Sequence, residues 1–201
     1  MPKVLTDPNI REFRERLCEA ATHMFAAHGP EGVTMRELAR ALDVSPMTPY
    51  RYFHDKNEIL AAVRARAFDR FAEALEEAYA VKGDALTRSR AVGEAYKRFA
   101  FGEPHSYRLM FDLDQPDEAQ YPDLVRATTR ARATMTDYVR GLIEARVISG
   151  DSRLIGHVFW SALHGAVVLQ MAGKLNDGPD FAQIAEASFR ALMQGFAPTP
   201  V

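Results

Sequence analysis

The sequence predicts an all-α protein of about nine helices in two domains, and three observations support this prediction. Apolar residues recur at steps of three and four through most of the 201 residues, as they do in amphipathic helices. Capping residues and prolines stand where several of these patterns begin. The hydrophobic content of 47% and the charged content of 26% are typical of a globular chain with a sizeable core. We place the domain boundary so that residues 1–55 and 56–201 form separate domains.

The first helix is predicted over residues 9–28. Its apolar residues recur at helical spacing: Ile10, Phe13, Leu17, Ala20, Ala21, Met24 and Phe25. Asp7 and Pro8 are suited to the start of a helix, and Gly29 is a stop signal.

A second, shorter helix is predicted after Thr34, because Thr34 and Glu37 have the spacing of a capping box. In a capping box each of the two side chains accepts a hydrogen bond from the backbone of the other residue. The side chains expected to face inward are Leu38, Ala39 and Leu42, and those expected to face outward are Arg36 and Arg40.

The stretch SPMTPYRYF at residues 45–53 holds two prolines inside a helical pattern. Ser45 could cap a helix with Pro46 in first position, and Pro49 would then remove the N–H that bonds back to Ser45. Alternatively, Thr48 is the cap, Pro49 is the first helical residue and residues 46–48 are a lead-in. Both interpretations predict a short, stiff helix after a turn at residues 43–45.

A long helix should follow from residue 56, because Asp55 and Glu58 again have capping-box spacing. Two short helices joined by a tight turn are the helix-turn-helix geometry, in which the second helix enters the DNA major groove. Side chains of such a helix reach base edges, and helix ends bind phosphates. The first 56 residues hold eight Lys and Arg against eight Asp and Glu, so a DNA-binding face must be local.

Residues 20–63 resemble the DNA-binding domain of the TetR family of bacterial transcriptional regulators. The matching residues are Phe25, Gly29, Gly32, Thr34, Met35, Leu38, Ala39, Val44, Ser45, Thr48, Tyr50, Arg51, Tyr52, Phe53, Lys56, Leu60 and Val63. Family members commonly carry a Gly two positions after the Ser and an aliphatic residue before the Tyr. This chain has Met47 and Pro49 there, which leaves open the length of the recognition helix and which side chains reach bases.

With this resemblance, we expect DNA contacts from the second helix, the turn and the recognition helix. The candidates are Thr34, Met35, Arg36, Ser45, Pro46, Met47, Thr48, Tyr50, Arg51, Tyr52, His54 and Lys56. Met47 and Thr48 are the best candidates for base contacts, because a flexible apolar side chain can meet thymine methyl groups. Arg51 could read a base, contact a phosphate or pair with Asp55 four residues on. Phe53 is expected in the core.

The rest of the chain predicts a second, all-helical domain, with helical patterns at residues 84–102, 104–111, 122–145, 152–172 and 180–196. This part resembles the ligand-binding and dimerisation domain of the same family. Trp160, His164 and Gly165, together with PHSYRLMF at residues 104–111, resemble the subgroup named for a Trp, His, Gly signature.

A helical bundle can bury a drug-sized ligand between its helices. The candidates for contacts with a small-molecule effector of unknown identity are Phe68, Tyr96, Tyr107, Met110, Phe111, Trp160 and His164. Each could instead be plain core, where Met and aromatic residues at helical spacing usually lie. His164 could orient a ligand or hold two helices together.

In the TetR family the last two helices pair with their copy in a homodimer. The residues expected at this interface are Leu154, Val158, Ala162, Ala166, Ile184, Phe189 and Leu192, and the alternative is that they are intramolecular core. A two-fold dimer should read two half-sites about 34 to 36 Å apart, or a multiple of that distance.

No sequence feature predicts an enzyme, a cofactor or a metal site. The sequence contains no HExxH, CxxC, GxSxG, Walker or dinucleotide-binding motif. Cys18 is the single cysteine; we expect it to be buried and inert, and a chain without disulfides suits the cytoplasm. The apolar stretch at residues 158–173 carries a histidine and is too short for a good membrane span, and no export signal is evident.

The sequence therefore predicts a TetR-like, ligand-responsive regulator, most often a repressor in this family, that binds a palindromic operator as a homodimer. The alternative is an all-helical small-molecule-binding protein without sequence-specific DNA binding, which Pro49 and the weak basicity of the first domain favour.

Overall fold

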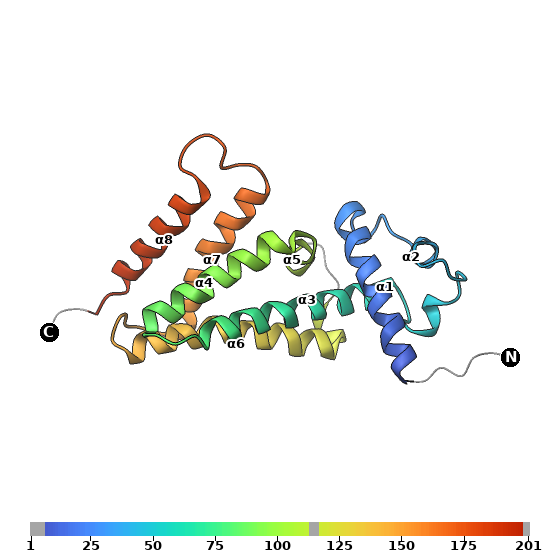
Figure 1. The fold of residues 1–201 in the computed structure, drawn as a ribbon, viewed down its shortest axis with the longest axis horizontal. Helices are drawn as coiled ribbons and strands as arrows, with labels where there is room; N and C mark the ends of the chain where they lie inside the picture. The colour runs from blue at the N-terminus through green and yellow to red at the C-terminus, as the bar shows by residue number, and fades with distance from the viewer. Residues whose placement is uncertain (1–6, 113–116, 199–201) are drawn as a thin grey trace. The chain divides into compact units, whose positions relative to one another are not determined.

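The computed structural model describes residues 7–112 and 117–198, and the elements in this part of the chain are all helical (Figure 1). Eight α-helices are present: α1 Asp7–His28, α2 Met35–Ala41, α3 Lys56–Tyr79, α4 Ala85–Gly102, α5 Pro104–Met110, α6 Pro122–Glu144, α7 Ser152–Met171 and α8 Phe181–Gly195. Two short 3-10 helices, η1 Pro49–Arg51 and η2 Glu118–Gln120, complete the set. The all-α prediction is confirmed.

The chain forms two compact units. Unit 1 comprises Met1–Arg70 and Glu103–Thr129, and unit 2 comprises Phe71–Gly102 and Arg130–Val201. The functional boundary predicted between residues 55 and 56 falls at the start of α3 and stays a prediction.

Local capping signals explain where several helices start. The predicted box at α2 is present: the Thr34 hydroxyl accepts a bond from the Glu37 amide, and the Glu37 carboxylate accepts one from the Thr34 amide at 2.8 Å. These bonds lower the pKa of Glu37, with the Thr34 side chain as the first cause. A second box, Asp180 with Gln183, starts α8. Asp55 accepts a bond from the Glu58 amide at 2.8 Å before α3, as expected of a cap.

The core of unit 1 joins α1, α2, η1, the first half of α3 and α5. Its buried members are Leu17, Cys18, Ala21, Phe25, Val33, Met35, Leu38, Phe53, Ile59, Leu60, Val63 and Leu109. Cys18 is buried, as predicted, and burial raises the pKa of its thiol, which disfavours the nucleophilic thiolate. Leu109 comes from α5, which packs against α1.

The core of unit 2 is rich in aromatic rings. Phe71 makes edge contacts with Tyr96 and Phe99, with ring centroids 5.2 Å apart in both cases. Helices α7 and α8 form a hairpin (Figure 1), in which Phe159 lies 5.7 Å from Phe189 between ring centroids. No described residue of α8 is fully buried, so most of this helix is accessible to a partner.

Helix α7 is long and apolar enough to cross a membrane by length and composition, and 28% of its apolar stretch is buried. One such helix is weak evidence for a membrane span, because the core helix of a soluble protein can pass the same test. The side chains left exposed on α7 include Leu154, Val168 and Leu169. An apolar helix face of this kind also suits contact with another protein.

Candidate functional site

The first candidate site is the reading segment, which we define as residues 45–54, between α2 and α3. Helix α2 ends in a tight turn in which Asp43 has a φ of 53° and the Val44 amide bonds to the Ala39 carbonyl at 3.0 Å. Next, the Thr48 amide bonds to the Ser45 carbonyl at 2.8 Å, which closes a turn around Pro46. The predicted turn at residues 43–45 is therefore present.

The predicted recognition helix is shorter than expected. Only Pro49–Arg51 is helical, as one turn of 3-10 helix, with Thr48 at the cap position but without a side-chain cap bond. The second interpretation of the prolines is therefore the better one, since Pro49 opens the helix and residues 46–48 form a turn. Pro49 has no N–H to donate, so it cannot make the backbone hydrogen bond that a longer helix starting at Pro46 would need at this position.

The reading segment is attached to the core of unit 1 on one side. Phe53 is 2% exposed, as predicted, and the Arg14 guanidinium lies 3.9 Å from the centre of its ring. Arg14 also donates a hydrogen bond to the Tyr52 carbonyl. The Tyr52 ring stacks on Phe13 with centroids 4.2 Å apart. These contacts hold the segment in place although little of it is regular helix.

The other side of the reading segment is exposed. Met47 is 67% exposed, the highest value among the exposed large apolar side chains of the described residues, and Tyr50 is 48% exposed. Arg51 is exposed as well, and the side chain of His54 is 91% exposed. A methionine, a tyrosine, an arginine and a histidine presented together can meet both base edges and phosphates.

The predicted DNA-contact residues occupy three environments. Exposed are Thr34, Arg36, Ser45, Pro46, Met47, Tyr50, Arg51 and His54, and half-buried are Thr48, Tyr52 and Lys56. Met35 is 7% exposed and its side chain belongs to the core, so only its backbone amide at the start of α2 can face DNA. Lys56 lies at the start of α3, with its amine 3.4 Å from a Glu31 carboxylate oxygen.

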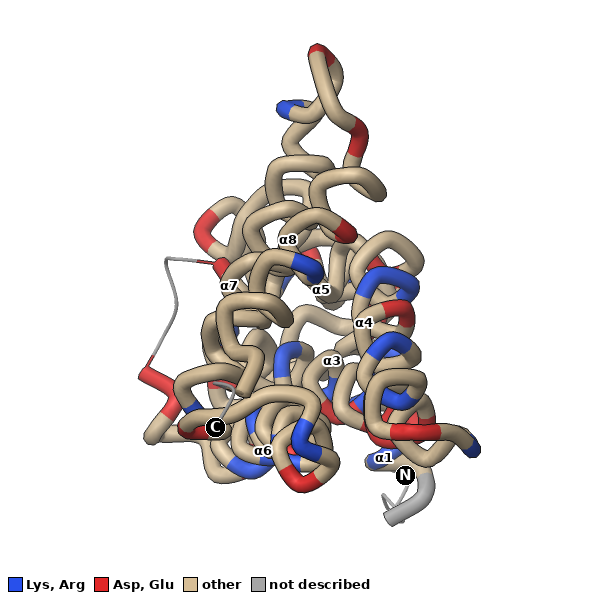
Figure 2. The backbone as a smooth tube through the Cα atoms, turned by 90° about the vertical axis from the view of Figure 1, so that its left-hand side faces the viewer, with Lys and Arg blue, Asp and Glu red and all other residues tan. Residues whose placement is uncertain are grey.

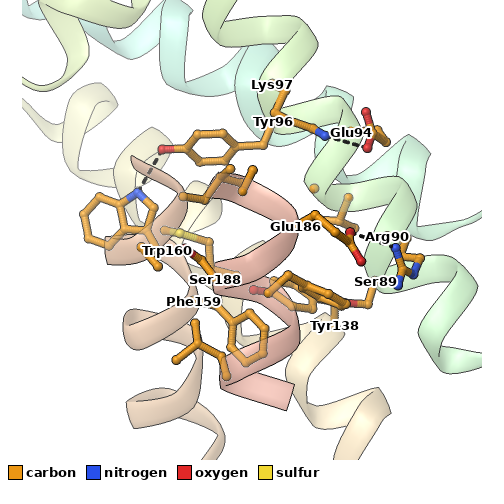
Figure 3. A pocket seen from close by; sticks show the side chains of 18 of the residues that line it. Ser89, Arg90, Glu94, Tyr96, Lys97, Tyr138, Phe159, Trp160, Glu186 and Ser188 are labelled. Carbon is orange, nitrogen blue, oxygen red and sulfur yellow. Dashed lines mark hydrogen bonds and ion pairs between the residues drawn. The ribbon is translucent and has the colours of Figure 1, made fainter. Parts of the chain in front are cut away.

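The second candidate site is a cavity of about 330 Å³ within unit 2, which we call the α4–α8 cavity (Figure 3). This volume is within the range of small-molecule pockets. Its walls come from α3, α4, α6, α7 and α8, and they are mostly apolar and aromatic. The large lining side chains are Leu75, Val92, Tyr96, Met135, Tyr138, Phe159, Trp160, Leu163, Phe189 and Leu192.

A chain of hydrogen bonds stands at one side of the α4–α8 cavity (Figure 3). Trp160 Nε1 donates to the Tyr96 hydroxyl at 3.2 Å, and that oxygen lies 3.3 Å from His164 Nδ1. Burial lowers the pKa of His164 and favours the neutral imidazole, whose unprotonated Nδ1 can accept a hydrogen bond from the Tyr96 hydroxyl.

The other polar residues of the α4–α8 cavity include two ion pairs and a buried hydroxyl group. Arg90 of α4 pairs with Glu186 of α8 at 3.3 Å, and Lys97 pairs with Glu94 on α4 at 2.6 Å. Ser89 also lines the cavity; it is 3% exposed, and its hydroxyl has no hydrogen-bond partner among the described residues. Burial raises the pKa of Tyr138, which keeps this phenol neutral in the cavity wall.

The structure brings only some of the predicted ligand residues together. Tyr96 and Trp160 line the α4–α8 cavity, and His164 is bonded to Tyr96. The others, Phe68, Tyr107, Met110 and Phe111, belong to unit 1, where Phe111 makes edge contacts with Phe68 and Tyr107. Sequence reasoning missed Ser89 and Gly93, although both share the helical face of Tyr96 at steps of four and three residues.

The residues predicted for the dimer interface also lie in different environments. Leu154 is 61% exposed, and Val158 and Ile184 are half-buried. Ala166 is buried, whereas Ala162, Phe189 and Leu192 line the α4–α8 cavity. Figure 2 shows that α7 and α8 carry few charged residues compared with α4 and α6.

A metal site finds no support in the described part of the chain, where no group of three or more His, Cys, Asp or Glu side chains could hold an ion.

Comparison with known proteins assigns both candidate sites to domains of one protein family. Residues 17–63 match the family described as bacterial regulatory proteins, tetR family, and residues 89–196 match the tetracyclin repressor-like C-terminal domain. The chain belongs to the TetR family. The first match covers α2 and the reading segment, and the second covers nearly all the residues that line the α4–α8 cavity. Membership in the Trp, His, Gly subgroup stays a prediction.

The chain is also similar to a named transcriptional regulator, and solved structures share its fold. The chain is 33% identical over 146 residues to the HTH-type transcriptional activator FasR of Mycolicibacterium smegmatis, covering 73% of this chain and 63% of that protein. A protein of unknown function from Rhodococcus sp. RHA1 has a TM-score of 0.79 at 26% identity, covering 98% and 100% of the two chains. The fatty acid degradation regulator FadR of Bacillus halodurans shares the fold, with a TM-score of 0.75 at 15% identity over 90% of this chain and 94% of that chain.

Proposed function

We propose that this TetR-family protein is a ligand-responsive transcriptional regulator, most simply a repressor, that binds a palindromic operator as a homodimer in the cytoplasm. The observation that carries the proposal is the reading segment. Its inner side is attached to the core through Phe53 and Tyr52, and its outer side exposes Met47, Tyr50 and Arg51. A monomeric binder of small molecules would have no use for such a segment.

The DNA contacts follow from the chemistry of the exposed side chains. Arg51 and Tyr50 can bond to phosphates or to base edges, and Met47 can contact thymine methyl groups. The exposed start of α2, with Thr34 and Arg36, offers backbone amides and a cation to a phosphate. Residues 1–55 would thus form the DNA-binding part, and residues 56–201 the part that binds effector and partner.

The dimer is supported by the apolar surface of α7 and α8. Leu154, Val168 and Leu169 are 61%, 44% and 46% exposed, and all lie on one helix. A second copy of the same helix pair would bury them in a two-fold interface. Two reading segments would then meet two half-sites of an operator.

The α4–α8 cavity is the proposed effector site. An effector that binds better to the state in which the two reading segments are wrongly spaced would weaken operator binding, and the operator would weaken effector binding by the same factor. A decisive switch requires a difference of about 5 kcal/mol between the two states.

The second candidate function is an all-helical small-molecule-binding protein without specific DNA binding. Its support is the single 3-10 turn at Pro49–Arg51, which is short for a helix that reads the major groove. A measurement of duplex binding against salt separates the two functions, because each phosphate contact adds a counterion-release term that a pure ligand binder lacks.

We would follow the fluorescence anisotropy of a labelled duplex between 50 and 300 mM salt, with the wild type, Arg51→Ala and the control Arg153→Ala on α7. The proposal expects the logarithm of affinity to fall linearly with the logarithm of salt, and Arg51→Ala to reduce the slope by about one. Arg153→Ala should leave the slope unchanged. Absence of duplex binding at the lowest salt would favour the second candidate function.

A further inference from the structure

The α4–α8 cavity carries information about the chemistry of its ligand. One face of α4 lines it, with Ser89, Gly93 and Tyr96 at successive steps of four and three residues. At 1.5 Å per residue, Ser89 and Tyr96 lie about 10 Å apart along the helix axis. Figure 3 accordingly shows Ser89 and Arg90 on one side of the cavity, and Tyr96 with Trp160 on the other.

The polar groups on the two sides of the cavity differ in whether they already have hydrogen-bond partners. At the Trp160 side, the Tyr96 hydroxyl is engaged by Trp160 and His164. At the other side, the Ser89 hydroxyl is buried and without a partner among the described residues. A buried hydroxyl without a partner is costly, so a ligand oxygen that accepts a hydrogen bond from Ser89 would increase the affinity.

The charges around the cavity do not call for an ionic ligand. The lining includes two cations, Arg90 and Lys97, and two carboxylates, Glu94 and Glu186, and each cation is already paired. A ligand carboxylate would therefore meet two like charges and have to compete with Glu186 for Arg90. A neutral oxygen, as in a ketone, bonds to Ser89 without this competition.

We propose that the cavity takes a neutral, elongated, largely alicyclic or aromatic molecule with one oxygen acceptor, that Ser89 binds this oxygen, and that Gly93 provides the room for the body of the ligand. A Cβ atom built at Gly93 meets nothing within 4 Å, so the space in front of it is open. The proposal rests on the effector role given above to this cavity and adds the chemical class of the effector.

The protein contains a built-in probe for this test. Trp160 is the single tryptophan of the chain and lines the cavity, so tryptophan fluorescence reports binding at this site alone. Three probes of one shape differ in a single group: bicyclohexyl, 4-cyclohexylcyclohexanone and 4-cyclohexylcyclohexanecarboxylate. Only the ketone absorbs near 295 nm, and its band is too weak to interfere in a dilute titration. Titration of the full chain without DNA gives a dissociation constant for each probe.

We expect the ketone to bind about three- to tenfold more tightly than bicyclohexyl, which is the usual effect of one hydrogen bond, and more tightly than the carboxylate. Ser89→Ala should remove the advantage of the ketone and leave bicyclohexyl binding unchanged. Gly93→Leu should fill the cavity and abolish binding of all three probes. Gly102→Leu is the matched control, because it lies on the same helix, faces open space and does not line the cavity.

Three results would overturn the inference: tightest binding by the carboxylate, a ketone preference that survives in Ser89→Ala, or no fluorescence response to any probe. Thermal melting of each variant shows that it is folded, and Gly93→Leu should melt no lower than the wild type because leucine favours helix. The two proposals can fail separately. A protein that binds the ketone but no duplex is not the proposed regulator, and one that binds duplex but none of the probes contradicts only the ligand class.

Discussion

At the scale of single residues, two turns contain a non-glycine residue in an unfavourable backbone conformation. Asp43 and Arg146 are the non-glycine residues with positive φ in the described chain, at 53° and 57°. Each follows a helix whose last carbonyls are bonded by the amides of the turn; at Arg146 the next amide, of Val147, reaches the Leu142 carbonyl at 2.9 Å. Glycine usually occupies this position because it has no Cβ.

Arg146→Gly should therefore stabilise the protein, by about 0.5 to 1 kcal/mol, since it removes left-handed strain at an exposed site. Chemical denaturation measures the change. Arg140→Gly, inside the same α6 helix, is the control and should destabilise by about 1 kcal/mol. Lower stability in Arg146→Gly would mean that the arginine makes contacts worth more than the strain.

His164 makes a pH-dependent contribution to stability. Burial lowers its pKa in the folded state, so the unfolded chain takes up the proton first as the pH falls. The stabilising effect is complete above the unfolded value of about 6.5 and is lost as the pH falls from there towards the folded value. We expect the melting temperature of wild type to drop more between pH 7.5 and 5.5 than that of His164→Asn. Equal drops in both proteins would show that this imidazole is not the responsible group.

At the scale of elements, a buried arginine ties the segment before α6 to α3. Arg64 of α3 is 4% exposed and bonds to the Glu118 carboxylate of η2 at 2.6 Å. Burial lowers the pKa of Arg64, and the hydrogen bond that Arg64 donates to Glu118 opposes that shift. The Glu118 carboxylate therefore offsets much of the cost of burying the Arg64 charge inside unit 1.

Glu118→Gln should cost about 2 kcal/mol of unfolding free energy, because it removes the hydrogen-bonded counter-ion of Arg64 and leaves only the weaker attraction of Asp112. Arg64→Met, which removes the charge but keeps much of the volume, should cost less, and the double variant should resemble Arg64→Met. Urea denaturation of the four proteins forms a double-mutant cycle. A double variant as unstable as the sum of the two single variants would contradict the coupling.

The elements also show what could be predicted from sequence. The capping boxes at Thr34 and Asp180 depend on neighbours three residues away, so local spacing is informative about helix starts. The reading segment was predicted in place, with the length of its helix left open. Helical periodicity continues to residue 53, but the helix ends after Arg51, which the spacing alone does not reveal. The cavity could not be predicted, since it depends on which faces of five helices meet. Aromatic residues such as Tyr107 and Phe111 have the same spacing as Tyr96 but pack in unit 1.

At the scale of the whole molecule, the proposed regulator requires a second copy of the chain. Leu154 and Val168 lie fourteen residues apart on α7, close to four helical turns, and both are exposed. Their helix is the most apolar in the chain, and α8 beside it has no fully buried residue. Association of two such hairpins removes this surface from water.

The double variant Leu154→Glu with Val168→Glu should be monomeric where the wild type is dimeric, because two buried carboxylates on each copy would face apolar surface. Sedimentation velocity measures the state at micromolar concentration. Val125→Glu, at a position of α6 that is 40% exposed, is the control and should leave the dimer intact. A wild type that is itself monomeric would contradict the assigned interface.

Selection of bound duplexes from a random library by the purified full chain at moderate salt tests whether the protein is a dimeric, sequence-specific regulator. We expect enrichment of a palindrome whose half-sites are about 34 to 36 Å apart or a multiple of that, with enrichment weakened in Arg51→Ala and Tyr52→Ala. A library that stays unenriched down to low salt, or a single site without two-fold symmetry, would contradict a dimeric, sequence-specific regulator.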